Sequence, residues 1–212
     1  MYSFRNDYSE GAHPQVLRAL TDTNLVQTCG YGVDPICDEA RALIRTLCAA
    51  PDAAVHFLVG GTQTNMTVIT ALLASYEAVI AAHTGHVNCH ETGAIEATGH
   101  KVCTAYSPDG KVTPEMVESV LAIHADGEEH MVAPKLVYIS DTTEIGTVYT
   151  KAELTALRQC CDAHDLLLFL DGARLGSALT SPENDLTLSD LAALTDVFTI
   201  GGTKNGALFG EA

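Results

Sequence analysis

The chain has 212 residues, enough for one domain of ordinary size and part of a second. Its composition is 47% hydrophobic and 18% charged, which is typical of a globular protein and excludes a disordered chain. The formal net charge of −16 argues against a nucleic-acid partner or an anionic membrane surface, and no apolar stretch reaches the ~18 residues that span a bilayer.

The amino-terminal part is predicted to be an arm followed by helices. Residues 7–14 are polar and rich in turn formers, and a short helix begins with Pro14 in its first turn. Residues 30–35 have the composition of a loop, and apolar residues recur at helical spacing from 37 to 50. Residues 1–50 are therefore predicted to form an amino-terminal arm and helix.

From residue 54 onward, apolar runs alternate with segments of helical periodicity. The runs predicted as strands are 54–59, 77–82, 101–106, 135–139, 166–170 and 197–200, and residues 207–212 look like the start of another. Helices are predicted after Gly61, over 91–98, after Thr113, after the capping box at Thr150, and over 188–194. This alternation predicts a three-layer α/β fold, with a mostly parallel sheet flanked by helices over residues 51–212.

The cysteines give no sign of a disulfide framework or a metal site. The seven cysteines, at positions 29, 37, 48, 89, 103, 160 and 161, form no Cys-x-x-Cys pair, and the nine histidines form no zinc-type pattern. The amino terminus also lacks the apolar segment of a secretory signal. We therefore expect reduced thiols, no bound metal and a cytoplasmic location.

Two apolar runs end in a charged residue close to glycine. The run 166–170 is followed by Asp171-Gly172, and the run 197–200 by Gly201-Gly202-Thr203-Lys204. Because the carboxyl ends of parallel strands meet at one edge of a sheet, we expect Asp171 and Lys204 to face the same ligand site. An acid for a pyridinium nitrogen and a lysine amine are what pyridoxal phosphate (PLP) requires.

A glycine-rich segment, Gly60 to Asn65, precedes the first helix of the α/β region. Glycine lets the backbone approach an anion, and the amides at a helix amino terminus can hold it. The segment matches neither a dinucleotide fingerprint nor a P-loop. Taken alone it is a glycine turn with Thr62 as an N-cap, but with Asp171 and Lys204 downstream we interpret it as a phosphate site.

These motifs, in this order, resemble those of the low-specificity threonine aldolases. The matching segments are Gly61-Thr62-Gln63, His86-x4-Glu91-x-Gly93, Asp171-Gly172-Ala173-Arg174 and Gly202-Thr203-Lys204, with Tyr31-Gly32-x-Asp34-Pro35 and Arg5-Asn6-Asp7 before them. This family lies in the β-eliminating lyase branch of fold-type-I PLP enzymes. The resemblance runs from residue 4 to 212, and it implies a fold-type-I large domain that is incomplete at its carboxyl end and lacks the small domain.

The resemblance also implies roles for individual residues. Lys204 would bind PLP covalently, Asp171 would pair with the ring nitrogen, and His86 would stack on the ring and help to remove the β-hydroxyl proton. Residues implied in phosphate binding are Gly61, Thr62, Gln63 and Thr203, and those implied in substrate binding are Asn6, Tyr31 and Arg174, the last also near the PLP oxygen. The plainer alternatives are a surface lysine, a capping aspartate, a surface ion pair, and a structural histidine such as His83 or His90.

The loop after the middle strand departs from the family pattern. Many threonine aldolases have a histidine there, whereas residues 141–149 contain none. A serine is also frequent in the family where this chain has Asn6. The general base and the preferred β-substituent therefore stay open.

The resemblance predicts a PLP-dependent lyase that cleaves β-hydroxy-α-amino acids such as threonine into glycine and an aldehyde. Two alternatives remain: β-elimination or transamination with the same cofactor, and a non-catalytic scaffold. We also expect a homodimer or homotetramer, with Tyr31 contributed to the site of a neighbouring subunit.

Overall fold

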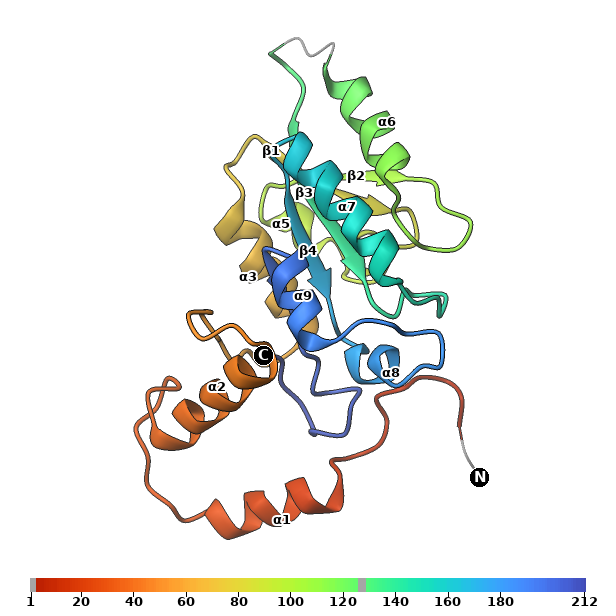
Figure 1. Cartoon of the computed structure of the whole chain (residues 1–212). Coiled ribbons are helices and arrows are strands. Elements are labelled where there is room, and N and C mark those ends of the chain that lie inside the picture. Colours follow the sequence, from red (N-terminus) through yellow and green to blue (C-terminus); the bar gives the residue numbers. More distant parts are fainter. Residues whose placement is uncertain (1–2, 126–128) are drawn as a thin grey trace.

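A parallel β-sheet forms the centre of the molecule (Figure 1), as seen in a computed structural model that describes residues 3–125 and 129–212. Within this part the sheet has five strands in the order β2-β1-β3-β4-β5, and every paired neighbour is parallel. The strands are β1 (Glu77–Ala82), β2 (Val102–Ala105), β3 (Ala133–Ser140), β4 (Leu167–Asp171) and β5 (Val197–Phe198).

The helices follow local signals in the sequence. Three of them begin with proline, which suits the first helical turn, and α7 and α9 begin with complete capping boxes. Their bounds are α1 (Pro14–Thr23), α2 (Pro35–Leu47), α3 (Gly61–Leu72), α4 (His86–Cys89), α5 (Ala94–Ala97), α6 (Pro114–Ala125), α7 (Lys151–Ala163), α8 (Leu175–Leu179) and α9 (Leu188–Leu194).

Alternate residues of each strand enter two different cores. In β1, Ala78 and Ile80 pack towards α6, α7 and α9, whereas Val79 and Ala81 pack towards α3 and α5. Because successive side chains of a strand point to opposite faces, this division places the sheet between two helical layers, as Figure 1 shows. The predicted three-layer α/β fold is confirmed.

Two predicted strands are wrong. Of residues 54–59, only Leu58 pairs, through an isolated antiparallel bridge to Glu211, and 207–212 likewise form bridges rather than a strand. Within the helix predicted over 91–98 the structure has only the shorter α5, and α4 and α8 were not predicted. The parallel strands and the longer helices lie where the sequence pattern placed them.

The helices α1 and α2 lie apart from the sheet, below it in Figure 1. All their residues are described, and none of them is buried. The arm before α1 contacts the carboxyl-terminal segment, since the His13 amide donates to the Gly206 carbonyl at 2.8 Å. The division of the chain at residue 50 stays a prediction.

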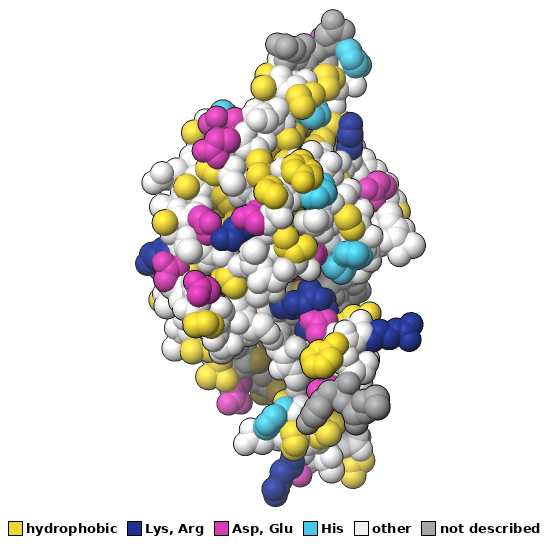
Figure 2. Space-filling model, turned by 90° about the vertical axis from the view of Figure 1, so that its right-hand side faces the viewer, with side chains coloured by type: hydrophobic (Ala, Val, Ile, Leu, Met, Phe, Trp, Pro, Cys, Tyr) yellow, Lys and Arg dark blue, Asp and Glu magenta, His cyan; other side chains and the backbone are white. Residues whose placement is uncertain are grey.

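Acidic side chains are spread over the face shown in Figure 2 rather than gathered in one place, and Lys and Arg form no continuous basic patch on it. The negative charge of the chain is thus distributed on this face. Among the residues that the structure describes, no helix has the length and apolar character needed to cross a membrane.

Candidate active site

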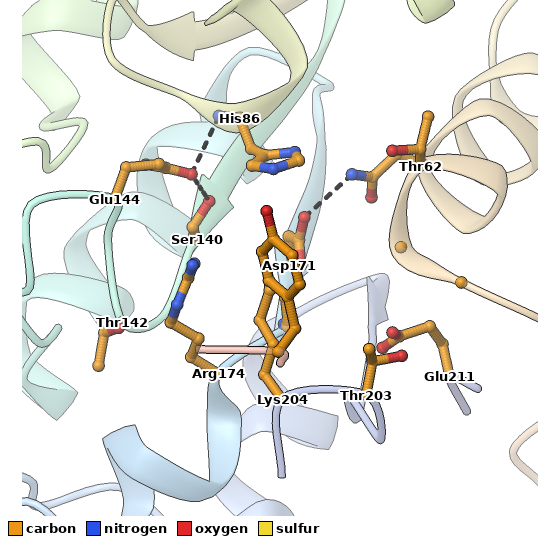
Figure 3. Close-up of a pocket in the computed structure, with 15 residues that line it drawn as sticks. Thr62, His86, Ser140, Thr142, Glu144, Asp171, Arg174, Thr203, Lys204 and Glu211 are labelled. Carbon is orange, nitrogen blue, oxygen red and sulfur yellow. Dashed lines mark hydrogen bonds between the residues drawn. The ribbon is translucent and has the colours of Figure 1, made fainter. Parts of the chain in front are cut away.

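A cavity of about 250 Å³ opens at the carboxyl edge of the sheet. The strand order reverses between β1 and β3, and ligands of open α/β sheets bind at such a switch point. The loops after β1, β3, β4 and β5 all reach the cavity. Its lining residues are Tyr8, Gly60, Gly61, Thr62, Asn65, His86, Ser140, Thr142, Glu144, Asp171, Ala173, Arg174, Thr203, Lys204 and Glu211 (Figure 3).

Asp171, the last residue of β4, is buried and held by three donors. The Tyr138 hydroxyl donates to Oδ2 at 2.6 Å, the Asn65 amide donates to the same oxygen at 3.0 Å, and the Ala173 backbone amide donates to Oδ1 at 2.9 Å. Burial and the Asp171 charge raise the pKa of Tyr138 well above its ordinary value, so Tyr138 stays a donor. The carboxylate is thus fixed in position at the floor of the cavity.

His86 begins α4, directly after β1, and its ring lies above Asp171 in Figure 3. Its Nδ1 lies 2.8 Å from Oε1 of Glu91, whose side chain is completely buried. Oε1 of Glu91 also accepts from the Asn65 amide at 2.6 Å. Asn65 therefore links the surroundings of His86 to Asp171.

Lys204 and Arg174 bring positive charge to the cavity. Arg174, after β4, is paired with Asp7 of the amino-terminal arm, with Nη2 3.2 Å from Oδ1. Burial alone raises the pKa of Asp7, but Arg174 and, more weakly, Lys204 outweigh it and hold that pKa below its usual value. A carboxylate of the chain itself thus pairs with the guanidinium for which the resemblance implies a substrate carboxylate.

The amino terminus of α3 forms another wall of the cavity. Its N-cap is Gly60 rather than Thr62, and no side chain of the described residues caps it. A Cβ built on Gly60 or Gly61 would meet nothing within 4 Å, so this wall is open. The first amides of a helix have no partner within it, and they favour an anion there. Gln63 lines an adjoining hollow, and its side chain accepts from the Val59 amide.

The loop after β3, which contains no histidine, brings Glu144 to the wall of the cavity. Its Oε1 accepts from the His86 backbone amide at 2.9 Å and from the Ser140 hydroxyl at 2.7 Å. Figure 3 shows these three residues together at one side of the cavity. Glu144 therefore positions the start of α4 and remains a polar group of the wall.

Glu211 was not expected in the site. Its backbone pairs with Leu58, and its side chain lines the cavity near Thr203 and Lys204. Burial and the negative charge of Asp171 raise the pKa of Glu211 to about 7, although Lys204 and a hydrogen bond with Thr203 act in the opposite direction. Residues 207–212 are predicted from their apolar pattern to begin a strand, and this pattern does not indicate that the Glu211 side chain lines a cavity.

Of the residues predicted for the site, most line the cavity, but Gln63, Asn6 and Tyr31 do not. Asn6 accepts from its neighbours Tyr8 and Ser9, and Tyr31 is fully exposed. The roles assigned to all these residues stay predictions. The lining residues that the sequence reasoning missed are Tyr8, Asn65, Ser140, Thr142, Glu144, Ala173 and Glu211.

One other grouping arises from the packing of α6 against α7. Glu118, Cys160 and His164 place potential metal-binding atoms within 4.8 Å of one another, a proximity that the sequence spacing did not indicate. Glu118 and His164 are exposed to solvent, and the grouping lies on a different part of the chain from the cavity. The expectation of no metal stays a prediction.

The sheet, its two helical layers and the charged residues at its carboxyl edge define the large domain of a fold-type-I α/β protein. The chain belongs to the β-eliminating lyase family, whose model matches residues 4–209. This confirms the resemblance found in the sequence.

Individual relatives point in the same direction. The chain is 36% identical to a low specificity L-threonine aldolase of Pseudomonas sp. (strain NCIMB 10558) and 34% identical to that of Pseudomonas aeruginosa, in both cases over 99% of this chain and 60% of the relative. It is 57% identical to the solved Leishmania major threonine aldolase, with a TM-score of 0.97, over 100% of this chain and 61% of that one. The chain thus spans about three fifths of the length of these relatives.

Proposed function

We propose that the protein is a PLP-dependent lyase that cleaves β-hydroxy-α-amino acids such as threonine into glycine and an aldehyde. The observation that carries the proposal is that Asp171 and Lys204 line one cavity together with the uncapped amino terminus of α3. The similar Pseudomonas and Leishmania proteins, named as threonine aldolases, support it.

The residues of the cavity fit PLP. The open wall at Gly60 and Gly61 suits a phosphate, because a helix amino terminus favours an anion and no Cβ fills the space. Asp171, which already accepts three hydrogen bonds as a carboxylate, suits a protonated ring nitrogen. Lys204 supplies an amine in the same cavity.

When bound, PLP would supply the electron sink for the pair released at Cα. The protein's own part is to orient the substrate and to move protons. Arg174 would bind the amino acid carboxylate once Asp7 has left it, since a guanidinium fork matches a carboxylate. His86, directly or through a water, would take the proton of the β-hydroxyl as the Cα–Cβ bond breaks.

The direct test is to incubate the protein and PLP with L-threonine and to assay acetaldehyde and glycine. Lys204→Ala should abolish both products and the long-wavelength absorbance of lysine-bound PLP. Lys101→Ala changes an exposed lysine that directly precedes β2. This variant is the matched control and should behave as the parent protein. A parent protein that shows neither absorbance nor products would leave the scaffold alternative.

The same test separates the other PLP reactions. With L-threonine, 2-oxobutyrate and ammonia would indicate β-elimination, the reaction in the family's description, and 3-hydroxy-2-oxobutyrate without release of ammonia would indicate transamination. Only glycine together with the aldehyde supports the proposed cleavage.

We further propose a cytoplasmic homodimer or homotetramer. The exposed apolar residues of α1 and α2 and the fully exposed ring of Tyr31 support association. All seven cysteines are free thiols, as suits a reducing compartment. Sedimentation of the purified protein tests the association, and a monomer at micromolar concentration would contradict it.

A further inference from the structure

Asn65 holds two carboxylates side by side. Its amide nitrogen lies 2.6 Å from Oε1 of Glu91 and 3.0 Å from Oδ2 of Asp171, and its side chain is buried. An amide NH2 has two hydrogens, one for each acceptor. The flipped amide would set its carbonyl oxygen against two carboxylates, so the orientation is determined by its partners.

Glu91 is the buried centre of this arrangement. Its side chain is completely inaccessible to solvent, and its Oε1 is hydrogen-bonded to the Asn65 amide and to Nδ1 of His86. Its Oε2 is buried with no hydrogen-bond partner among the described residues. Burying a carboxylate oxygen without a partner is costly, so the position of Glu91 calls for a role beyond packing.

The contact with Glu91 determines which nitrogen of His86 carries the proton. A carboxylate only accepts, and Nδ1 lies 2.8 Å from it, so Nδ1 must donate. In a neutral imidazole the other nitrogen, Nε2, is then left as the acceptor. We propose that Glu91, held by Asn65, is a positioning residue that fixes His86 in the Nδ1–H tautomer and leaves Nε2 as the proton acceptor of the cavity.

For catalysis this inference rests on the proposed function. There it answers the question left open by the loop after β3, because it makes His86 Nε2 the group that receives the β-hydroxyl proton, directly or through a water. The shared donor Asn65 ties the orientation of His86 to that of Asp171, which lies at the other end of the same hydrogen-bonded chain. The tautomer itself does not depend on any cofactor.

The test is two-bond ¹H–¹⁵N correlation spectroscopy of the ¹⁵N-histidine-labelled protein in alkaline buffer, where imidazoles are neutral. His86, assigned by its loss in His86→Gln, should show the Nδ1–H pattern in the parent protein. Glu91→Leu should convert it to the Nε2–H pattern. Glu91→Gln keeps an acceptor oxygen for both donors and should keep the Nδ1–H pattern. Glu96→Gln, at an exposed glutamate of α5, is the matched control and should change nothing.

An Nε2–H pattern for His86 in the parent protein would overturn the inference, whatever activity is found. If Glu91→Leu does not fold, the parent protein and Glu91→Gln decide the matter. In the PLP-loaded enzyme, Glu91→Leu should lower kcat on the order of 100-fold with a smaller change in KM. A protein that shows the Nδ1–H pattern but cleaves no threonine would contradict the proposed function alone.

Discussion

At the scale of single residues, Asp141 links stability to pH. It directly follows β3, it is buried, and burial raises the pKa of its carboxyl from 3.8 to about 7, against weaker opposing effects of the Tyr149 amide and Lys111. Between these two values the folded protein binds a proton that the unfolded chain has lost. The contribution of Asp141 to stability therefore falls as pH rises through this window and is constant above it.

We expect Asp141→Asn to stabilise the protein by about 2–4 kcal/mol near pH 8, and by clearly less near pH 5. Urea unfolding at the two pH values measures the difference. Asp52→Asn, at an exposed aspartate, should show no such dependence on pH. An equal effect of Asp141→Asn at both pH values would contradict the prediction.

Gly172 is a second residue whose identity is required by the structure. Its amide donates to the Thr199 hydroxyl at 2.8 Å, and a Cβ at this position would overlap the Thr199 backbone carbonyl. We expect Gly172→Ala to destabilise the protein by about 3 kcal/mol or more, because backbone atoms cannot move aside cheaply. Gly61→Ala, where a Cβ meets open space, should leave the thermal midpoint nearly unchanged.

The site residues that could be predicted from the sequence are those that follow an apolar run typical of a buried strand. Asp171 and Lys204 follow apolar runs beside glycine, and both line the cavity. Asn65 could not be assigned in this way, because its partner Asp171 is 106 positions away and nothing local records that contact. Glu211 reaches the cavity through bridges to Leu58 and Gly201, which are equally invisible to local periodicity.

At the scale of elements, local hydrogen bonds decide where helices begin. In α7, the Thr150 hydroxyl accepts from the Glu153 amide, while the Glu153 carboxylate accepts from the Thr150 amide at 2.8 Å. Thr150→Ala should lower the free energy of unfolding by about 1 kcal/mol, measured by urea denaturation. Thr155→Ala, within the same helix, is the control, and it should be neutral or slightly stabilising. Equal losses in the two variants would rule out a role for the cap.

The two wrong strands have the same cause. An apolar run indicates burial, but a strand also needs a neighbour to complete its hydrogen bonds. Among the described residues, 54–59 and 207–212 form isolated bridges with each other and with Gly201, and Ala212 also exchanges backbone hydrogen bonds with Ile200. By contrast, 166–170 lies between two strands, and its pattern alone was sufficient to predict it. The five-residue α8 is too short for a periodic signal.

At the scale of the whole molecule, α2 carries an exposed apolar stripe. Ile36, Leu43 and Leu47 recur at helical spacing, and each is at least half exposed. If this stripe is a subunit contact, a double substitution of Leu43 and Leu47 by glutamate should shift the protein towards the monomer in sedimentation experiments. Ala42→Glu adds a charge off the stripe and should leave the association intact. Unchanged association of the double variant would place the contact elsewhere.

The cavity is lined on one side by the start of α3, near the beginning of the α/β region. It is lined on another side by residues of the segment from Thr203 to Glu211, after the last strand. No continuous fragment that stops before β5 can therefore hold an anion between the helix and the lysine. During synthesis, the segment from Thr203 to Glu211 leaves the ribosome after all five strands of the sheet. Loading of any cofactor that needs both walls is consequently a late event in the maturation of the protein.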